Sequence, residues 1–266
     1  MTGSVRRRVA RGAALAAIAA LAGACRSPDI RLAYAPAPGT VYRYAVHVVS
    51  TSTTVLSGRA PQRHADVLDF VAVDTVLAAD QAGTRLRVEV SSGPRSLGSY
   101  VVRLDRQAAL TGIDAENGQP LTAAGALQLQ DLLPAVAGAP PDRPLRPGDR
   151  WQVNEPVQLP TLAAARLVGA GRLDALGVLD GRRVAETRAT GSIELGPTAS
   201  GSAGQVGLRG HETIFVTSAR AVDDGAVERS TASTKGLFDI LLLADGKAPL
   251  VTGQLVVNVS STTRRL

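Results

Sequence analysis

The chain of 266 residues has few of the side chains that most often build reactive or metal-binding centres. It contains one cysteine and three histidines. A single cysteine excludes an intramolecular disulfide. The histidines, His47, His64 and His211, lie far apart, and none stands in a His-x-x-x-His pattern or near the cysteine. The sequence therefore predicts no metal site.

Motifs for catalysis and for cofactors are scarce as well. The Gly-x-Ser-x-Gly elbow of serine hydrolases does not occur in the sequence. Gly169-Ala170-Gly171-Arg172 matches only part of a dinucleotide-binding loop, so close packing of sheet surfaces is the better interpretation. Asp223-Asp224-Gly225 holds two potential calcium ligands, but a hairpin turn accounts for it. We expect a protein that is not an enzyme and uses no cofactor.

Charge and aromatic content argue against nucleic acid as a partner. The formal charge is +6, but residues 1–24 contain four arginines and no acid, so residues 25–266 carry 6 − 4 = +2. Only 3% of the residues are aromatic, which leaves few rings for bases to stack on. We therefore expect no binding of nucleic acid.

The chain also lacks an apolar run long enough to cross a bilayer, which takes about 20 residues. Its longest apolar run, Ala13–Ala22, follows four arginines and precedes Gly23-Ala24. A basic start, a short apolar segment and small residues before a break are typical of a secretion signal. We interpret residues 1–24 as a signal peptide.

Cys25 directly follows Leu21-Ala22-Gly23-Ala24, and this stretch resembles the lipobox of bacterial lipoproteins. The resemblance implies cleavage between Ala24 and Cys25, a diacylglyceryl group on the thiol and acylation of the new amino terminus, for example with palmitate. Two or three acyl chains hold a protein stably on a membrane. We expect an exported protein, anchored to the bacterial cell membrane or outer membrane. The alternative is an ordinary signal-peptidase site with Cys25 as an incidental thiol.

Beyond the anchor, residues 25–40 contain Pro36 and Pro38 and show no clear periodicity, so we predict a tether. Alternation then begins, with Tyr42, Tyr44 and Val46 on one face of an extended segment and His47 on the opposite, polar face, where we expect it to be exposed. A period of two indicates a half-buried strand. Further alternating stretches separated by short turns predict an antiparallel meander in residues 41–139.

One stretch within this first half has a helical pattern, near residues 121–137. Leu129, Leu132, Leu133 and Val136 follow the spacing i, i+3, i+4 and i+7. Thr122 can cap the start, and Gly138 with the prolines after it ends the pattern. We predict one amphipathic helix packed on the apolar face of the sheet.

Residues 140–266 are predicted to form a second β half that belongs to the same domain as the first. Pro147-Gly148-Asp149-Arg150-Trp151 repeats the pattern of Pro38-Gly39-Thr40-Val41-Tyr42, namely Pro-Gly, two residues and an aromatic that opens a strand. This echo leaves a two-fold internal duplication open. The Gly- and Ser-rich residues 196–210 are predicted to form a loop.

Three strand-like stretches are rich in serine and threonine: 50–54, 230–234 and 260–263. If these strands are neighbours, their hydroxyls line one patch of the sheet, where they could bind sugars or wall polymer. The simpler interpretation is a soluble outward face built from good strand formers.

The order of lipobox, tether, Pro-Gly-x-x-Tyr strand, meander, helix and Pro-Gly-Asp-x-Trp strand resembles uncharacterised bacterial lipoproteins with an all-β domain. More distantly it is similar to half-barrel envelope lipoproteins and lipoprotein carriers. These resemblances imply a mainly β, antiparallel curved sheet, a half-barrel or sandwich, that binds a lipid or other apolar ligand. The alternative is a structural or interaction module that contacts an envelope protein or wall polymer through its Ser/Thr-rich strands.

Overall fold

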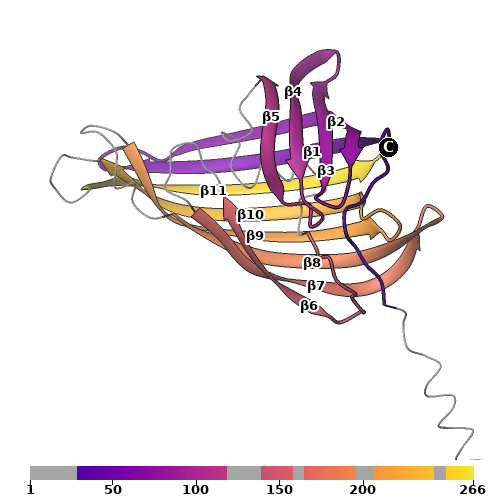
Figure 1. The fold of residues 1–266 in the computed structure, drawn as a ribbon. Helices are drawn as coiled ribbons and strands as arrows, with labels where there is room; N and C mark the ends of the chain where they lie inside the picture. Colours follow the sequence, from indigo (N-terminus) through magenta and orange to yellow (C-terminus); the bar gives the residue numbers. More distant parts are fainter. Residues whose placement is uncertain (1–28, 119–138, 158–164, 196–205, 243–249) are drawn as a thin grey trace, which may run out of the picture.

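The computed structural model describes residues 29–118, 139–157, 165–195, 206–242 and 250–266. Eleven strands in these ranges form one large, open, curved antiparallel sheet (Figure 1). The strands are β1 (Val41–Leu56), β2 (Gln62–Ala79), β3 (Thr84–Ser92), β4 (Arg95–Leu104), β5 (Leu110–Gly118), β6 (Arg150–Val157), β7 (Ala165–Leu179), β8 (Arg182–Leu195), β9 (Val206–Ala221), β10 (Val227–Leu242) and β11 (Leu250–Arg265). The prediction of a mainly β, antiparallel curved sheet is confirmed.

The strand order is β5-β4-β3-β2-β1-β11-β10-β9-β8-β7-β6. Each strand pairs with its neighbours in sequence, except that β1 pairs with β11 and that β5 and β6 form the two edges. The first and last strands therefore meet in the middle of the sheet, and the two predicted β halves form one continuous layer.

The predicted helix near residues 121–137 lies outside the described residues, which contain no helix. The predicted loop 196–210 is wrong at its end, because β9 already begins at Val206. Valine, leucine and isoleucine recur along this strand, and their preference for a pleated, half-buried surface outweighs the few glycines at its start.

Burial alternates along most strands and distinguishes the two faces of the sheet. In β3 every second residue from Thr84 to Val90 is buried, and the residues between them are exposed. The register aligns the buried sets, since Tyr44 of β1 faces Ala72 of β2, and Ala72 faces Val90 of β3. We call the side that carries the buried residues the inner face and the opposite side the outer face.

Residues 29–40 run along one end of the sheet, from the side of β6 and β7 to the side of β1 (Figure 1), and we call them the strap. Ile30 and Leu145 exchange two backbone hydrogen bonds of 3.0 and 2.8 Å. Farther along, the amide of Tyr34 donates to the carbonyl of Arg106 and that of Ala35 to the carbonyl of Asp224, both at 3.0 Å. The strap thus connects distant parts of the chain.

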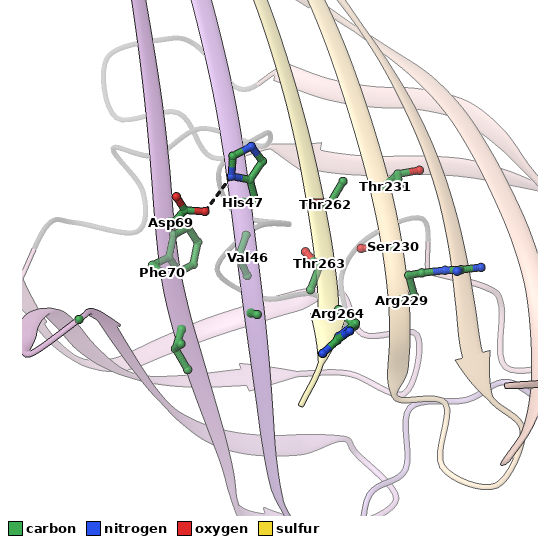
Figure 2. A pocket seen from close by; sticks show the side chains of 13 residues that line it. Val46, His47, Asp69, Phe70, Arg229, Ser230, Thr231, Thr262, Thr263 and Arg264 are labelled. Atoms are coloured by element: carbon green, nitrogen blue, oxygen red, sulfur yellow. Dashed lines mark hydrogen bonds and ion pairs between the residues drawn. The ribbon is translucent and has the colours of Figure 1, made fainter. Parts of the chain in front are cut away.

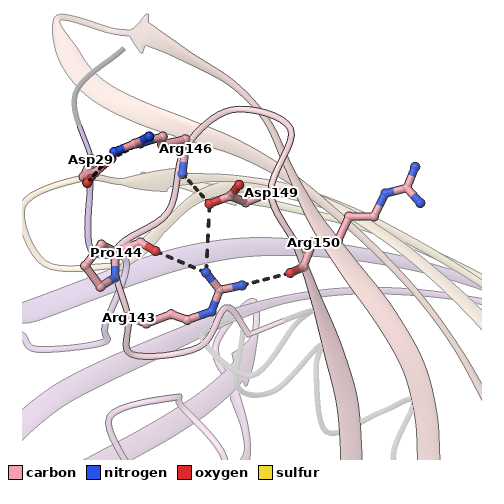
Figure 3. Close-up of polar contacts among 6 residues, drawn as sticks. All are labelled: Asp29, Arg143, Pro144, Arg146, Asp149 and Arg150. Carbon is pink, nitrogen blue, oxygen red and sulfur yellow. Dashed lines mark hydrogen bonds and ion pairs between the residues drawn. The ribbon is translucent and has the colours of Figure 1, made fainter. Parts of the chain in front are cut away.

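Ion pairs hold the start of the strap to the loop before β6 (Figure 3). Asp29 pairs with Arg146, and this hydrogen bond holds the pKa of the Asp29 carboxyl below its usual range. The Arg146 amide donates to the carboxylate of Asp149 at 2.9 Å, and Arg143 donates to the carbonyl of Arg150 at 2.9 Å. These contacts order the loop on which the strap lies.

The strap differs from the predicted tether, of which residues 25–28 lie outside the described residues. Ile30, Leu32 and Tyr34 are at most 5% exposed and join two of the three apolar clusters of the core. Apolar residues at 30, 32 and 34 form a period-two pattern that marks an extended, half-buried segment. Three residues are too short a run to stand out beside the prolines that follow.

The two Pro-Gly motifs adopt the same backbone geometry. Gly39 and Gly148 both have positive φ, 83° and 97°. The Gly39 amide donates to Val76 of β2, whose own amide donates to Thr40. In the second half, the Gly148 amide donates to Leu173 of β7, whose amide donates to Asp149. The sequence echo is therefore a shared turn that starts β1 and β6, while duplication of the two halves stays a prediction.

Gly225, in the β9–β10 turn, provides a test of how closely the strap approaches the sheet. Its φ is +72°, and a Cβ added there would lie 2.5 Å from the carbonyl oxygen of Ala33. We expect Gly225→Ala to lower the free energy of unfolding by about 2 kcal/mol, through backbone strain and through displacement of the strap.

The matched control for this substitution is Gly181→Ala. Gly181 has a similar φ of +80°, but a Cβ there would meet no atom within 4 Å. Urea unfolding of both variants separates the φ cost, which they share, from the steric cost, which only Gly225→Ala carries. Equal losses of stability in the two variants would show that the strap does not constrain Gly225.

Candidate functional site

The inner face of β8, β9 and β10 carries a continuous apolar surface, which we call the inner patch. Its members are no more than 8% exposed, and partly buried Leu255 and Val257 of β11 extend it. They are Ile193, Leu195, Ile214, Val216, Ala232 and Phe238. Apolar side chains of this kind are the usual lining of a site that binds an apolar ligand.

Glycines on the inner face allow large side chains to lie flat on the sheet. A Cβ at Gly236 would collide with the ring of Phe238, one at Gly171 with the ring of Trp151, and one at Gly191 with Leu167. In each case a bulky side chain covers the space that a side chain on the glycine would occupy. The close-packing interpretation of the Gly169–Arg172 stretch fits this arrangement.

One carboxyl group lies within the inner patch. Glu212 of β9 is the register partner of Ile193 on β8 and of Gly236 on β10. Burial raises the pKa of this carboxyl to about 7. The carboxyl therefore changes charge near neutral pH, and a titrating group in an apolar setting is a common feature of binding sites.

The three hydroxyl-rich stretches lie on neighbouring strands, because β10, β11 and β1 are adjacent. Ser230 pairs with Thr263, Thr231 with Thr262 and Ser233 with Ser260. The hydroxyls do not form one patch, however, because alternation sends successive side chains to opposite faces. Ser230, Thr234, Ser261 and Thr263 are buried on the inner face, whereas Thr231, Ser233, Ser260 and Thr262 are exposed on the outer face or partly so.

The buried hydroxyls continue as a row across the inner face. Thr187 pairs with Ser218, Ser218 with Ser230, and Ser230 with Thr263, so the row crosses β8 to β11. The Thr187 and Ser218 hydroxyls are 2.8 Å apart. This hydrogen bond satisfies the Thr187 and Ser218 hydroxyls and joins β8 to β9 at this point.

The outer face has a hollow of about 530 Å³ over β2, β1, β11 and β10 (Figure 2). Exposed side chains of all four strands border it. Nδ1 of His47 and Oδ1 of Asp69 are 2.7 Å apart at one side, and Thr262 and Thr231 follow in the same register row. The prediction that His47 lies on an exposed face of its strand is confirmed.

Two arginines stand side by side in this hollow. Arg229 of β10 and Arg264 of β11 are register partners and both line it. Within the residues that the structure describes, neither guanidinium has an ion pair or hydrogen bond. The two guanidinium groups therefore stand on adjacent strands without a charged partner among the described residues, and Figure 2 shows them pointing in different directions.

A second, smaller hollow of about 200 Å³ adjoins the first and shares Arg229, Ser230 and Thr231 with it. Its other borders include Glu186 and Thr217. The hydroxyls of Thr217 and Thr231 are 2.7 Å apart and lie between the two hollows. We call these two adjoining hollows together the outer groove.

The other predicted site residues fall outside these surfaces. Ala24 and Cys25 lie outside the described residues, so their roles in cleavage and lipidation stay predictions. Among the described residues no three His, Cys, Asp or Glu side chains gather where they could hold a metal ion. Asp224 of the Asp223-Asp224-Gly225 turn accepts hydrogen bonds from the Tyr42 hydroxyl and the Ala226 amide.

Comparison with known proteins identifies no relative: no family model and no curated protein matches the chain. In the part of the chain that the structure describes, no helix is long and apolar enough to cross a membrane. Function must therefore be argued from the surfaces themselves.

Proposed function

We propose that the protein is a non-enzymatic envelope lipoprotein, anchored at Cys25, whose inner face binds a lipid or another apolar ligand. The inner patch carries this proposal. It is a continuous apolar surface on one side of a single curved layer. Within the described residues, the strands that contact each other extensively are all hydrogen-bonded neighbours in this layer. The predicted helix near residues 121–137 is part of the proposal as a cover for this surface.

The Glu212 carboxyl supports an amphiphilic ligand over a purely hydrocarbon one. A carboxyl buried among apolar groups has lost hydration. The polar head of an amphiphile can restore hydrogen bonds to that carboxyl while its apolar part contacts Ile214 and Phe238, which lie in the same patch. This arrangement predicts that ligand release depends on pH near neutrality.

The short separation along the chain between the strap and Cys25 also supports the proposal of a lipid anchor. Four residue steps separate Cys25 from Asp29, and an extended chain of that length spans at most about 14 Å. In this proposal acyl groups on Cys25 therefore hold the end of the sheet that carries the strap within that distance of the bilayer surface. The ligand would exchange with the membrane over a short path.

The direct test is native mass spectrometry of the exported protein, purified from the envelope of its host, followed by organic extraction. We expect a reproducible adduct that solvent releases and that is identified as a lipid. A bare polypeptide mass under gentle conditions, with an intact fold by circular dichroism, would contradict the proposal. Mass spectrometry of the amino-terminal peptide tests acylation of Cys25 independently.

A pair of neighbouring substitutions tests which face binds. Val257 lies on the inner face of β11 and extends the inner patch, whereas Val256 is 37% exposed on the outer face. We expect Val257→Asp to weaken binding of a fluorescent fatty acid about tenfold, because it adds a charge to an apolar surface.

The control Val256→Asp introduces the same charge one residue away. It should change the affinity by less than about twofold, since that side chain points to solvent. Equal weakening by both substitutions would mean that the added charge acts through stability or through the membrane, and not through contact with the ligand.

A further inference from the structure

The outer groove carries its positive charge in the middle and acidic groups toward its ends. In the middle, on β10 and β11, the guanidinium groups of Arg229 and Arg264 are hydrogen-bond donors with positive charge. The only acid bordering this hollow is Asp69, which pairs with His47 at 2.7 Å. Paired guanidinium groups of this kind suit a phosphate or carboxylate.

The end of the outer groove over β7 and β8 is rich in acceptors. Glu186 borders it and has no ion pair or hydrogen bond among the described residues. Asp174 also borders it, and Arg188 neutralises that carboxylate at 2.7 Å. Carboxylate oxygens accept hydrogen bonds from the hydroxyls of an uncharged sugar, but they repel an anion.

Hydroxyls link the two ends of the groove. One register row crosses the outer face from Asp69 through His47, Thr262, Thr231 and Thr217 to Arg188. Hydroxyl and imidazole groups both donate and accept hydrogen bonds, as sugar hydroxyls do. The row therefore provides matched partners along the length of the groove.

From this arrangement we propose that the outer groove binds an oligosaccharide bearing a carboxylate or phosphate group. The anionic group lies against Arg229 and Arg264, and the uncharged sugars extend over Thr231 and Thr217 toward Glu186. The unpaired arginines are the main observation, because an anionic group bound in the hollow supplies the opposite charge that neither guanidinium has among the described residues. This site is on the opposite face from the inner patch, and its occupancy does not depend on the proposed lipid binding.

An elongated glycan fits better than an anionic bilayer surface. The two unpaired arginines lie in the middle of the outer groove, and Glu186 at its β8 end repels a surface of uniform negative charge. Binding to a membrane would also depend on every arginine of the outer face, whereas binding of one anionic group depends on the two arginines that contact it. This difference is measurable.

The test uses the exported protein, solubilised in mild detergent and immobilised, with binding measured by surface plasmon resonance. The probes are sialyllactose, a trisaccharide with one carboxylate, neutral maltotriose, inorganic phosphate, and vesicles of phosphatidylglycerol. We expect sialyllactose to bind about tenfold more tightly than maltotriose or phosphate, because only this probe engages both the arginines and the acceptors over β8 and β9.

Two variants decide whether the groove is responsible. The double substitution Arg229→Gln with Arg264→Gln should weaken sialyllactose about tenfold, to the level of maltotriose. Its melting temperature should not fall, because the substitution removes a like-charge pair. The control is Arg87→Gln, which removes an exposed charge from the outer face of β3, outside both hollows, and should leave sialyllactose binding unchanged.

Three outcomes would overturn the proposal. Sialyllactose affinity that the double variant does not change would exclude the arginine pair. Equal binding of maltotriose and sialyllactose would exclude an anion site. Binding to the vesicles alone, weakened equally by Arg87→Gln and by the double variant, would mean that the outer face senses a charged membrane and has no glycan site.

Discussion

Replacing Leu32 with alanine is expected to lower the free energy of unfolding by about 3–4 kcal/mol, a large loss for a residue so near the amino terminus. Leu32 is 1% exposed and packs with Leu145, Trp151 and Leu173 in the cluster that the strap shares with β6 and β7. The substitution removes apolar contacts and leaves a cavity at the point where the strap joins the sheet. Urea unfolding followed by circular dichroism measures the change.

The matched control is Leu266→Ala, which deletes the same atoms at a site that is 59% exposed. This variant should lose less than about 0.5 kcal/mol, because an exposed leucine transfers little apolar surface from water on folding. If Leu32→Ala is as stable as Leu266→Ala, the strap does not pack on the sheet in solution, and residues 29–40 are the tether that composition alone predicts.

The second large effect is a dependence of stability on pH, caused by Asp74. This residue lies on the inner face of β2, is 1% exposed, and its Oδ1 has no hydrogen-bond partner among the described residues. Burial raises its pKa from 3.8 to about 8. The carboxyl is therefore neutral at pH 7 in the folded protein and ionised in the unfolded chain.

The sign of the effect follows from proton uptake on folding. Below pH 3.8 both states hold the proton and Asp74 carries no penalty, but between pH 3.8 and about 8 only the folded state holds it. The free energy of unfolding therefore falls as pH rises through this window, by up to roughly 1.4 kcal/mol per pH unit. Above the folded-state pKa the loss levels off.

Asp74→Asn removes this titration and should be the more stable protein at neutral and alkaline pH. We expect the difference in free energy of unfolding between the variant and the natural protein to grow by about 3–4 kcal/mol from pH 5 to pH 8. Asp69→Asn, a change at an exposed site on the outer face, is the control and should leave the slope as it is. A slope that Asp74→Asn does not alter would show that this carboxyl is hydrated in the folded protein.

The end of the sheet along which the strap runs, near Asp74, differs physically from the remainder of the inner face. Tyr34, Tyr42 and Tyr44 are buried there, and burial raises the pKa of each phenol. Arg220 is fully buried in the same region and donates to the carbonyl of Gly225. Buried polar groups at this end make it sensitive to substitution, whereas the apolar inner patch tolerates changes of shape more easily.

Strands and turns were predictable because they depend on local pattern. Alternation around Tyr42 and Val46 marks β1, and the Asp180-Gly181 pair marks the turn between β7 and β8, where both residues have positive φ. A side chain's face within a strand follows from a period of two and needs no knowledge of the neighbouring strand. For the same reason the exposure of His47 was predicted correctly.

The binding surfaces could not be predicted in the same way. Arg229 lies near the start of β10 and Arg264 near the end of β11, and only the register of β10 with β11 brings them together. No signal in the sequence marks the register between two strands, because shifting one strand by two residues leaves each side chain on the same face of the sheet. Glu212 was likewise not singled out, since its burial depends on neighbours from β8 and β10.

The sequence by itself determined the strand content, the antiparallel meander and the Pro-Gly turns, because each depends on interactions among residues close along the chain. Only the tertiary structure decided that β1 pairs with β11, that the strap joins the core, and that the hydroxyls of three stretches divide between two faces. These features depend on contacts between residues up to 200 and more positions apart, such as Tyr44 with Arg265. Such contacts form where the folded sheet buries the most apolar surface, which is a property of the whole chain.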